Sequence, residues 1–102
     1  MDYKVVLAPR AIEDLRDIVL YVAPERPDVA KRLGLMLIER IKILGSFPFS
    51  GRVVPEFADP SVRELILKPY RIAYRVDDVA KVVGVARYWH GARSELGLQD
   101  VH

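Results

Sequence analysis

The chain has 102 residues, of which 51% are hydrophobic and 29% charged, and its formal net charge at pH 7 is +2. This length and composition fit one globular domain, residues 1–102, with a single hydrophobic core. The absence of cysteine excludes disulfides, thiolate metal sites and a cysteine nucleophile. The sequence contains no apolar run near the roughly 18 residues of a membrane span and no secretory signal pattern at its start. We therefore expect a soluble, cytoplasmic protein without a membrane partner.

The first half of the chain predicts one short strand and two helices. Tyr3–Leu7 is a β-rich run that ends at a proline, so we expect an edge or first strand there. A helical pattern follows up to Pro24, with apolar residues at Ala11, Ile12, Leu15, Ile18, Val19 and Val22. A second helix is expected from Pro27 to Gly45, with its stripe at Ala30, Leu33, Leu37, Ile41 and Leu44.

The acidic residues of the first helix are interpreted as a solvated face. Glu13, Asp14 and Asp17 have no histidine at ligand spacing, so a metal site is not expected. The glycines form no phosphate-cradling loop, and no nucleotide-binding pattern is present. The sequence thus predicts neither a metal nor a cofactor.

The second half predicts three strands. Residues 46–60 contain several prolines and are expected to be a loop. Tight connections at Lys68-Pro69 and Asp77-Asp78 then indicate three antiparallel strands in a meander. The order β-α-α-β-β-β predicts an α+β fold in which a helical hairpin packs on a small antiparallel sheet.

Positive charge is concentrated in these three strands. Residues 62–93 carry seven Lys or Arg and three Asp or Glu, whereas the residues before them carry nine of each. Arg71 and Arg75 alternate with apolar residues, so both are expected on the open face of the sheet, with Arg63 continuing the stripe from the preceding strand. Such a basic surface suits a large anionic or acidic partner, although a solvated face is equally compatible with the pattern.

The last strand carries the remaining candidate residues. Arg87 and Trp89 share a face, where the tryptophan is either an interface anchor or a core residue. His90, together with Arg71, Arg75, Arg87 and Arg93, could supply the base, acid and cations that RNA cleavage needs. The alternative is that His90 only hydrogen-bonds the backbone at the strand end.

The order of motifs resembles the RelE/ParE superfamily of toxins from bacterial toxin–antitoxin modules. The resemblance covers nearly the whole chain and rests on four pieces, namely Leu44–Arg52, Arg63-Glu64-Leu65, Tyr70–Val76 and His90–Arg93. It implies the β-α-α-β-β-β fold predicted above. It also implies a toxin that a cognate antitoxin, ParD-like or related, neutralises in a hetero-oligomeric complex.

The superfamily contains two mechanisms, and the resemblance favours one of them. RelE-like members cleave messenger RNA in the ribosome, whereas ParE-like members inhibit DNA gyrase. Arg71 falls on an arginine of the nuclease pattern and Arg63 near a lysine, but Leu65, Gly91 and Gly97 stand at other catalytic positions. The Tyr88–Arg93 ending is instead similar to the ParE-like branch. The resemblance therefore implies a gyrase inhibitor without catalytic residues, and the ribosome-dependent nuclease using Arg71, Arg87, His90 and Arg93 is the alternative.

Two surfaces follow from this interpretation. The expected target-binding set is Arg63, Arg71, Arg75, Arg87, Trp89, His90 and Arg93. The expected antitoxin-binding set lies along one side of the second helix and comprises Val29, Leu33, Met36 and Arg40, with core packing as the alternative for Leu33 and Met36. A third hypothesis, a nucleic-acid-binding module, agrees with the basic, aromatic strands but less well with the low net charge.

Overall fold

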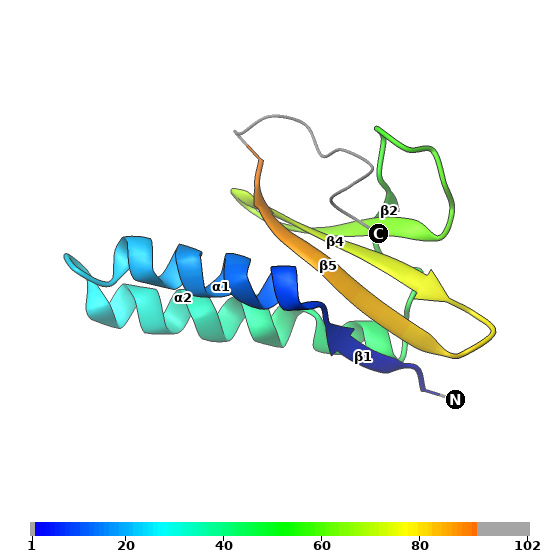
Figure 1. Cartoon of the computed structure of the whole chain (residues 1–102), viewed down its shortest axis with the longest axis horizontal. Helices are drawn as coiled ribbons and strands as arrows, with labels where there is room; N and C mark the ends of the chain where they lie inside the picture. Colours follow the sequence, from blue (N-terminus) through cyan, green and yellow to red (C-terminus); the bar gives the residue numbers. More distant parts are fainter. Residues whose placement is uncertain (1, 92–102) are drawn as a thin grey trace.

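The computed structural model describes residues 2–91, in which two helices cover one face of a five-stranded sheet (Figure 1). The elements are β1 (Lys4–Leu7), α1 (Pro9–Val22), α2 (Pro27–Arg40), the 3-10 helix η1 (Lys42–Gly45), β2 (Arg52–Val53), β3 (Val62–Leu67), β4 (Tyr70–Asp77) and β5 (Val82–His90). The predicted α+β class and the helical hairpin on a sheet are confirmed. Arg93, a candidate site residue, and Gly97, a position of the nuclease comparison, lie outside the described residues.

The sheet has the strand order β1-β5-β4-β3-β2. The antiparallel meander β3-β4-β5 is as predicted. Two features differ from the expectation: β1 runs parallel to β5, with Lys4 opposite Val82, and the short β2 forms inside the expected loop. The sheet is therefore mixed, because the long connection through both helices lets β1 return alongside the last strand.

Both helices begin at a proline in the first turn, where the missing amide N–H costs no hydrogen bond. α1 ends at Val22, as Pro24 predicts. α2 ends at Arg40 and not at Gly45, since the chain tightens into η1 after it. Among residues 2–91 no helix has the length and apolarity needed to cross a membrane.

The main core lies between the helices and the sheet. The face of β4 that carries Ile72, Tyr74 and Val76 packs there with Leu37 and Leu44, as the alternation predicts. The hydroxyl of Tyr88, on β5, donates a 2.9 Å hydrogen bond to the carbonyl of Leu37. That carbonyl lies in the last turn of α2, where helix carbonyls lose their intrahelical partners. Burial raises the pKa of Tyr88 to about 12.

The opposite face of the sheet carries a second, smaller core. Val54, Val62, Ala73 and Ala86 are buried there, and Phe57 and Trp89 pack against them. The segment after β2 supplies Val54 and Phe57, so it covers part of the face that the sequence predicted to be open. The polar site described next lies on this covered face.

Candidate functional site

The outer face of the sheet is built around a buried carboxylate. The side chain of Glu64, on β3, is 0% exposed. Its two oxygens accept hydrogen bonds of 2.6 Å from Nε of Arg52 and 2.6 Å from Nε of Arg71. The register places Arg52 directly opposite Glu64 and Glu64 opposite Ala73, so these side chains share one face.

Arg71 has a second carboxylate partner. Its Nη1 and Nη2 donate to the two oxygens of Glu56 at 2.9 and 2.8 Å, the paired geometry that suits a guanidinium. These hydrogen bonds from Arg71 to Glu56 raise the pKa of the guanidinium, as does its pairing with Glu64. A cleft of about 440 Å³ beside this pair is lined by Arg52, Pro55, Glu56, Arg71 and Gly91.

The predicted basic stripe is not continuous. Arg75 lies 3.7 Å from Asp59, so it also has a carboxylate neighbour. Hydrogen bonds from the backbone and hydroxyl of Ser61 lower the pKa of that carboxyl. Arg63 is opposite Tyr74, and it is therefore on the other face from Arg71 and Arg75. The expectation that Arg63 extends the stripe is wrong, because the strand register places Glu64 there instead.

The guanidinium of Arg63 is hydrogen-bonded to backbone carbonyl groups. Its Nε donates to the carbonyl of Pro60 at 2.8 Å, and its Nη1 donates to the carbonyls of Phe49 and Gly51 at 3.2 and 3.1 Å. Its guanidinium carbon also lies 5.1 Å from the ring centre of Phe49. Arg63 therefore holds both ends of the segment that surrounds β2.

Arg87 forms a buried ion pair with α1. Its Nε and Nη2 donate to the two oxygens of Asp14 at 2.6 and 3.0 Å, and the two residues are only 5% and 9% exposed. The irregularity between β4 and β5 sets Arg87 opposite Ala73, on the outer face. Because β1 ends opposite Val85, the guanidinium can pass the free edge of β5 to reach α1.

Asp14 does more than balance this charge. It also accepts a hydrogen bond of 3.1 Å from the backbone N–H of Tyr88, which lies beyond the part of β5 that pairs with β1. The prediction that Asp14 belongs to a solvated helix face is therefore wrong, while Glu13 and Asp17 are exposed as expected. Asp14 is three residues after the buried Ala11, and that spacing places it on the inner side of α1.

Trp89 and His90 point to opposite faces of β5. Trp89 is half-buried in the outer core, and the guanidinium carbon of Arg87 lies 4.7 Å from its ring centre. His90 lies on the helix side, with its ring 5.5 Å from that of Tyr70 in an edge-on arrangement. Arg71 is on the outer face beside Trp89, its partner across the strands. The structure thus brings Arg71, Arg87 and Trp89 to one face and places His90 on the other.

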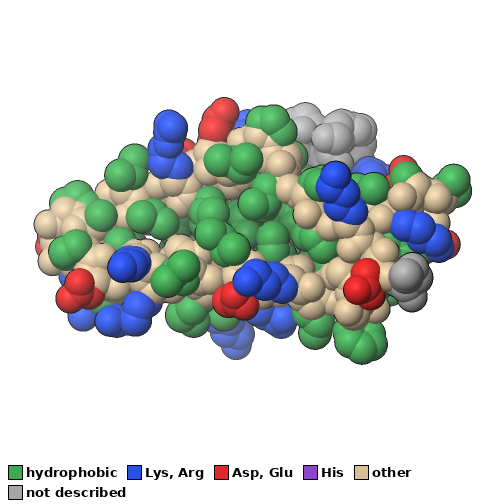
Figure 2. All heavy atoms as spheres, turned by 90° about the horizontal axis from the view of Figure 1, so that it is seen from below, with side chains coloured by type: hydrophobic (Ala, Val, Ile, Leu, Met, Phe, Trp, Pro, Cys, Tyr) green, Lys and Arg blue, Asp and Glu red, His purple; other side chains and the backbone are tan. Residues whose placement is uncertain are grey.

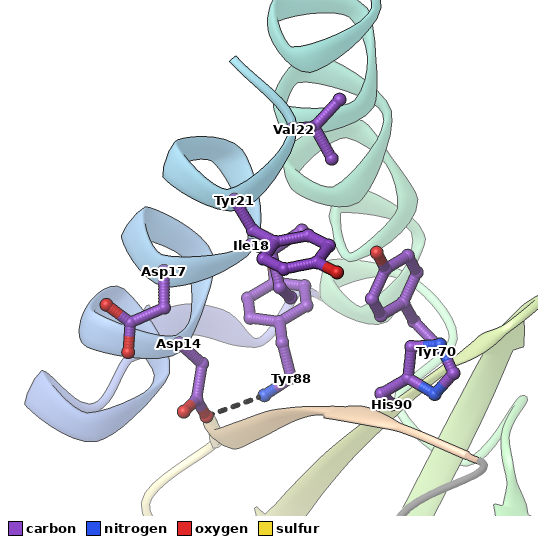
Figure 3. Close-up of a pocket in the computed structure, with 8 residues that line it drawn as sticks. All are labelled: Asp14, Asp17, Ile18, Tyr21, Val22, Tyr70, Tyr88 and His90. Atoms are coloured by element: carbon purple, nitrogen blue, oxygen red, sulfur yellow. Dashed lines mark hydrogen bonds between the residues drawn. The ribbon is translucent and has the colours of Figure 1, made fainter. Parts of the chain in front are cut away.

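A larger cleft opens where α1 diverges from the ends of β4 and β5. It has a volume of about 610 Å³ and is lined by Asp14, Asp17, Ile18, Tyr21, Val22, Tyr70, Tyr88 and His90 (Figure 3). The sequence interpretation did not find this cleft. Tyr21 and Tyr70 stand far apart in the chain, and only the packing of α1 against β5 brings them together.

The residues expected to meet an antitoxin lie along one side of α2. Val29 and Leu33 are half-buried, and Leu33 packs against the main core. Met36 is 52% exposed, whereas Arg40 is half-buried. Further exposed apolar side chains of the two helices are Ile12, Leu20, Leu35 and Ile38. Figure 2 shows hydrophobic side chains gathered in the middle of the face seen from below, with charged side chains around them.

Comparison with known proteins identifies the family. The model of the family described as the ParE toxin of the type II toxin–antitoxin system parDE matches residues 5–95. The chain belongs to the ParE toxin family. A relative named Toxin RelE1, from Caulobacter vibrioides, is 30% identical over 95 residues, which cover 89% of this chain and 96% of that protein.

Solved structures described as a ParDE system, a RelBE2 complex and the toxin RelE contain chains of the same fold. A chromosomal ParDE system from P. aeruginosa superposes with a TM-score of 0.72 at 23% identity, covering 86% of this chain and 95% of that chain. The RelBE2 toxin–antitoxin complex from Mycobacterium tuberculosis gives 0.67 at 21%, covering 88% and 99%. A mutant of the E. coli toxin RelE in the free state gives 0.59 at 21%, covering 90% and 86%. The ParE-family fold of the chain is thus independently supported.

Proposed function

We propose that this ParE-family toxin acts in the cytoplasm on DNA gyrase and so stops DNA replication, and that a cognate antitoxin neutralises it. The observation that carries the choice of target is the dispersal of the groups that a nuclease would need. Arg71 and His90 lie on opposite faces of the sheet. A cleavage centre requires a base, an acid and cations within reach of one phosphate.

The charges of the arginines also favour a binding function over a catalytic one. Arg71 is held by Glu56 and Glu64, and Arg87 by Asp14. A guanidinium in such a pair has to give up a carboxylate before it can bind a phosphate, and breaking a buried pair costs several kcal/mol, on the order of 3–5. Catalysis through these two side chains would therefore require a rearrangement of the outer face.

The second candidate function is a ribosome-dependent mRNA endonuclease. One observation favours it: the relative at 30% identity carries the name Toxin RelE1. In that case Arg71, Arg87, His90 and Arg93 are the candidate catalytic residues, and the ribosome would have to release Arg71 from its carboxylates.

The proposed antitoxin contact is the side of α2 that bears Val29, Leu33, Met36 and Arg40. The exposed Met36 and the half-buried Val29 and Leu33 give that side an apolar surface, which suits an amphipathic segment that folds on binding. Two structurally similar proteins are described as a ParDE system and as a RelBE2 toxin–antitoxin complex, which supports a hetero-oligomer of this kind. The proposed target surface is the outer face, where Arg75, with a side chain 42% exposed, is more accessible than Arg71 at 15%.

The test is controlled expression of the chain in a bacterial host with pulse labelling of DNA and protein synthesis. We expect DNA synthesis to fall and an SOS response to begin while translation continues. An immediate fall in translation, with messenger RNA cut at ribosomal positions, would contradict the gyrase proposal and support the nuclease. Unchanged growth at a verified level of folded protein would contradict both.

A variant pair sharpens the test. Replacement of the exposed Arg75 by Ala should reduce inhibition of gyrase-dependent supercoiling, because it removes a cation from the proposed target surface. The matched control is Lys31→Ala, on the exposed side of α2, which should retain full inhibition. Equal effects of both variants would contradict the assignment of the outer face.

A further inference from the structure

We infer that the cleft between α1 and the ends of β4 and β5 binds an arginine side chain, and that the antitoxin supplies it, an inference that rests on the proposed function. The charge of the cleft and the side chains that line it both favour this ligand.

The cleft is acidic although the chain as a whole is basic. Asp14 and Asp17 line it, and among residues 2–91 no lysine or arginine does. The charge of Asp14 is used by Arg87. Asp17 is one turn away on α1, is exposed, and makes no ion pair or hydrogen bond within the described part of the chain. One carboxylate at the rim is therefore available to a cation.

Aromatic rings line the cleft on the side away from the carboxylate of Asp17, which lies at its rim. Tyr21 is 89% exposed, and Figure 3 shows its ring extending from α1 toward Tyr70, with Tyr88 behind them. The face of a tyrosine ring attracts a cation, and most strongly where water is partly excluded.

An arginine fits this lining better than a lysine or an anion. A planar guanidinium stacks on aromatic rings and is more weakly hydrated than an ammonium group. Its apolar stem would lie on Ile18 and Val22, which line the same cleft. A phosphate or a carboxylate is disfavoured, because it would be placed beside two aspartates.

The experiment is an NMR titration of the full-length chain with a short peptide probe. The probe is N-acetyl-Leu-Arg-Leu-amide, and its control replaces arginine by the neutral isostere citrulline. We expect amide shifts confined to residues of the cleft, a dissociation constant on the order of millimolar, and binding of the citrulline peptide at least about 5-fold weaker.

Two variants and two matched controls complete the test. Asp17→Asn and Tyr21→Ala should each weaken the arginine peptide about 3- to 10-fold. Glu13→Gln and Leu20→Ala change exposed residues of the same helix that do not line the cleft, and they should leave binding within about 2-fold. All four positions are exposed, so folding should be retained, which the amide spectrum itself reports.

Three results would overturn the inference: equal binding of the citrulline peptide, unchanged affinity in both cleft variants, or no shift in the cleft at all. Use of the isolated chain separates this outcome from that of the proposed function. A chain that does not inhibit DNA synthesis can still bind the peptide, and an active toxin can fail to bind it. A coexpressed antitoxin should then also bind the Asp17→Asn variant more weakly than the Glu13→Gln variant.

Discussion

At the scale of single residues, the charged side chains of this protein are mostly structural. Asp14 joins α1, to which it belongs, to β5, because it pairs with Arg87 and accepts a hydrogen bond from the backbone amide of Tyr88. This one buried carboxylate pairs with an arginine and also accepts a hydrogen bond from a strand edge, and no adjacent side chain can take over both interactions. Its loss removes the carboxylate that pairs with Arg87 and the acceptor of the Tyr88 amide in a buried place.

Replacement of Asp14 by Asn should therefore destabilise the fold strongly. We expect the free energy of unfolding to fall by about 3–5 kcal/mol, as for other buried pairs that lose one partner. Urea denaturation measures this loss. Asp17→Asn, one turn further along the same helix and exposed, is the control and should stay within about 0.5 kcal/mol of the parent. A similar small change in both variants would show that the Asp14 pair contributes little.

The raised pKa of Tyr88 predicts that the fold loses stability at alkaline pH. Burial raises its pKa to about 12, above the value near 10 of an unfolded tyrosine. The protonated hydroxyl of Tyr88 therefore stabilises the fold fully below about pH 10. This stabilisation is lost as the pH rises toward 12, and the free energy of unfolding falls by at most about 1.4 kcal/mol per pH unit.

The measurement is urea denaturation of the parent and of Tyr88→Phe across that interval. The variant also loses the hydrogen bond to Leu37, worth about 1 kcal/mol at neutral pH. We expect the stability difference between the two proteins to decrease as tyrosine ionises. A difference that stays constant from pH 9 to 12 would contradict the burial of the hydroxyl.

At the scale of elements, the approach of β2 to β3 depends on one glycine. The amide of Gly51 donates to the hydroxyl of Tyr74 at 2.9 Å. A Cβ at this position would lie 2.5 Å from the carbonyl oxygen of Glu64 and 2.6 Å from that hydroxyl. The backbone oxygen cannot move aside without disturbing the pairing of β3, so even a methyl group does not fit.

Gly51→Ala should consequently cost several kcal/mol, about 3 or more, and displace the segment that carries Glu56. Gly84→Ala is the matched control, since a Cβ there meets nothing within 4 Å. In the middle of a strand that change should be neutral or stabilise by up to about 1 kcal/mol. Thermal unfolding compares the two, and equal melting temperatures would contradict the close approach.

The elements themselves were largely predictable from local patterns. Helical spacing, prolines and tight turns located α1, α2 and the three strands of the meander, because each of these signals acts over a few residues. The parallel pairing of β1 with β5 was not predictable in this way. It joins residues almost 80 positions apart, and the sequence of β1 contains no feature that distinguishes a parallel neighbour from an antiparallel one.

The candidate site was less predictable than the fold. Alternation along β4 correctly separated Arg71 from the apolar residues, but it does not reveal which carboxylates lie opposite. Glu64 lies in a largely apolar strand, where a charged residue needs a partner. Its position was therefore the signal in the sequence that could have indicated a buried ion pair. Glu56 comes from an irregular segment, where no period applies. The aromatic cleft depends on tertiary packing alone.

At the scale of the whole molecule, the charge of the sheet is compensated by the rest of the chain. Arg52, Arg71, Arg75 and Arg87 each have a carboxylate within 4 Å, supplied by Glu64, Glu56, Asp59 or Asp14. Three of these four carboxylates come from residues before β3. The local excess of basic residues in the sequence therefore does not become an equally strong positive field.

We accordingly expect weak binding to nucleic acid. A fluorescent single-stranded RNA should bind the chain with a low salt dependence, equivalent to about one or two released counterions. Fluorescence anisotropy at several salt concentrations measures the slope. Glu56→Gln frees one side of Arg71 and should increase both affinity and slope, whereas Glu13→Gln should not. A steep slope in the parent would contradict charge compensation and favour a nucleic-acid-binding function.

The pairing of β1 with β5 also determines when the sheet can form during translation. Residues 4–7 are translated long before their strand partners, residues 82–85. Asp14 likewise waits for Arg87 and Tyr88. A nascent chain cannot close its sheet until residues 82–85 have been translated, because such distant contacts form late. A chain that stops before β5 thus lacks the strand that joins β1 to the rest of the sheet.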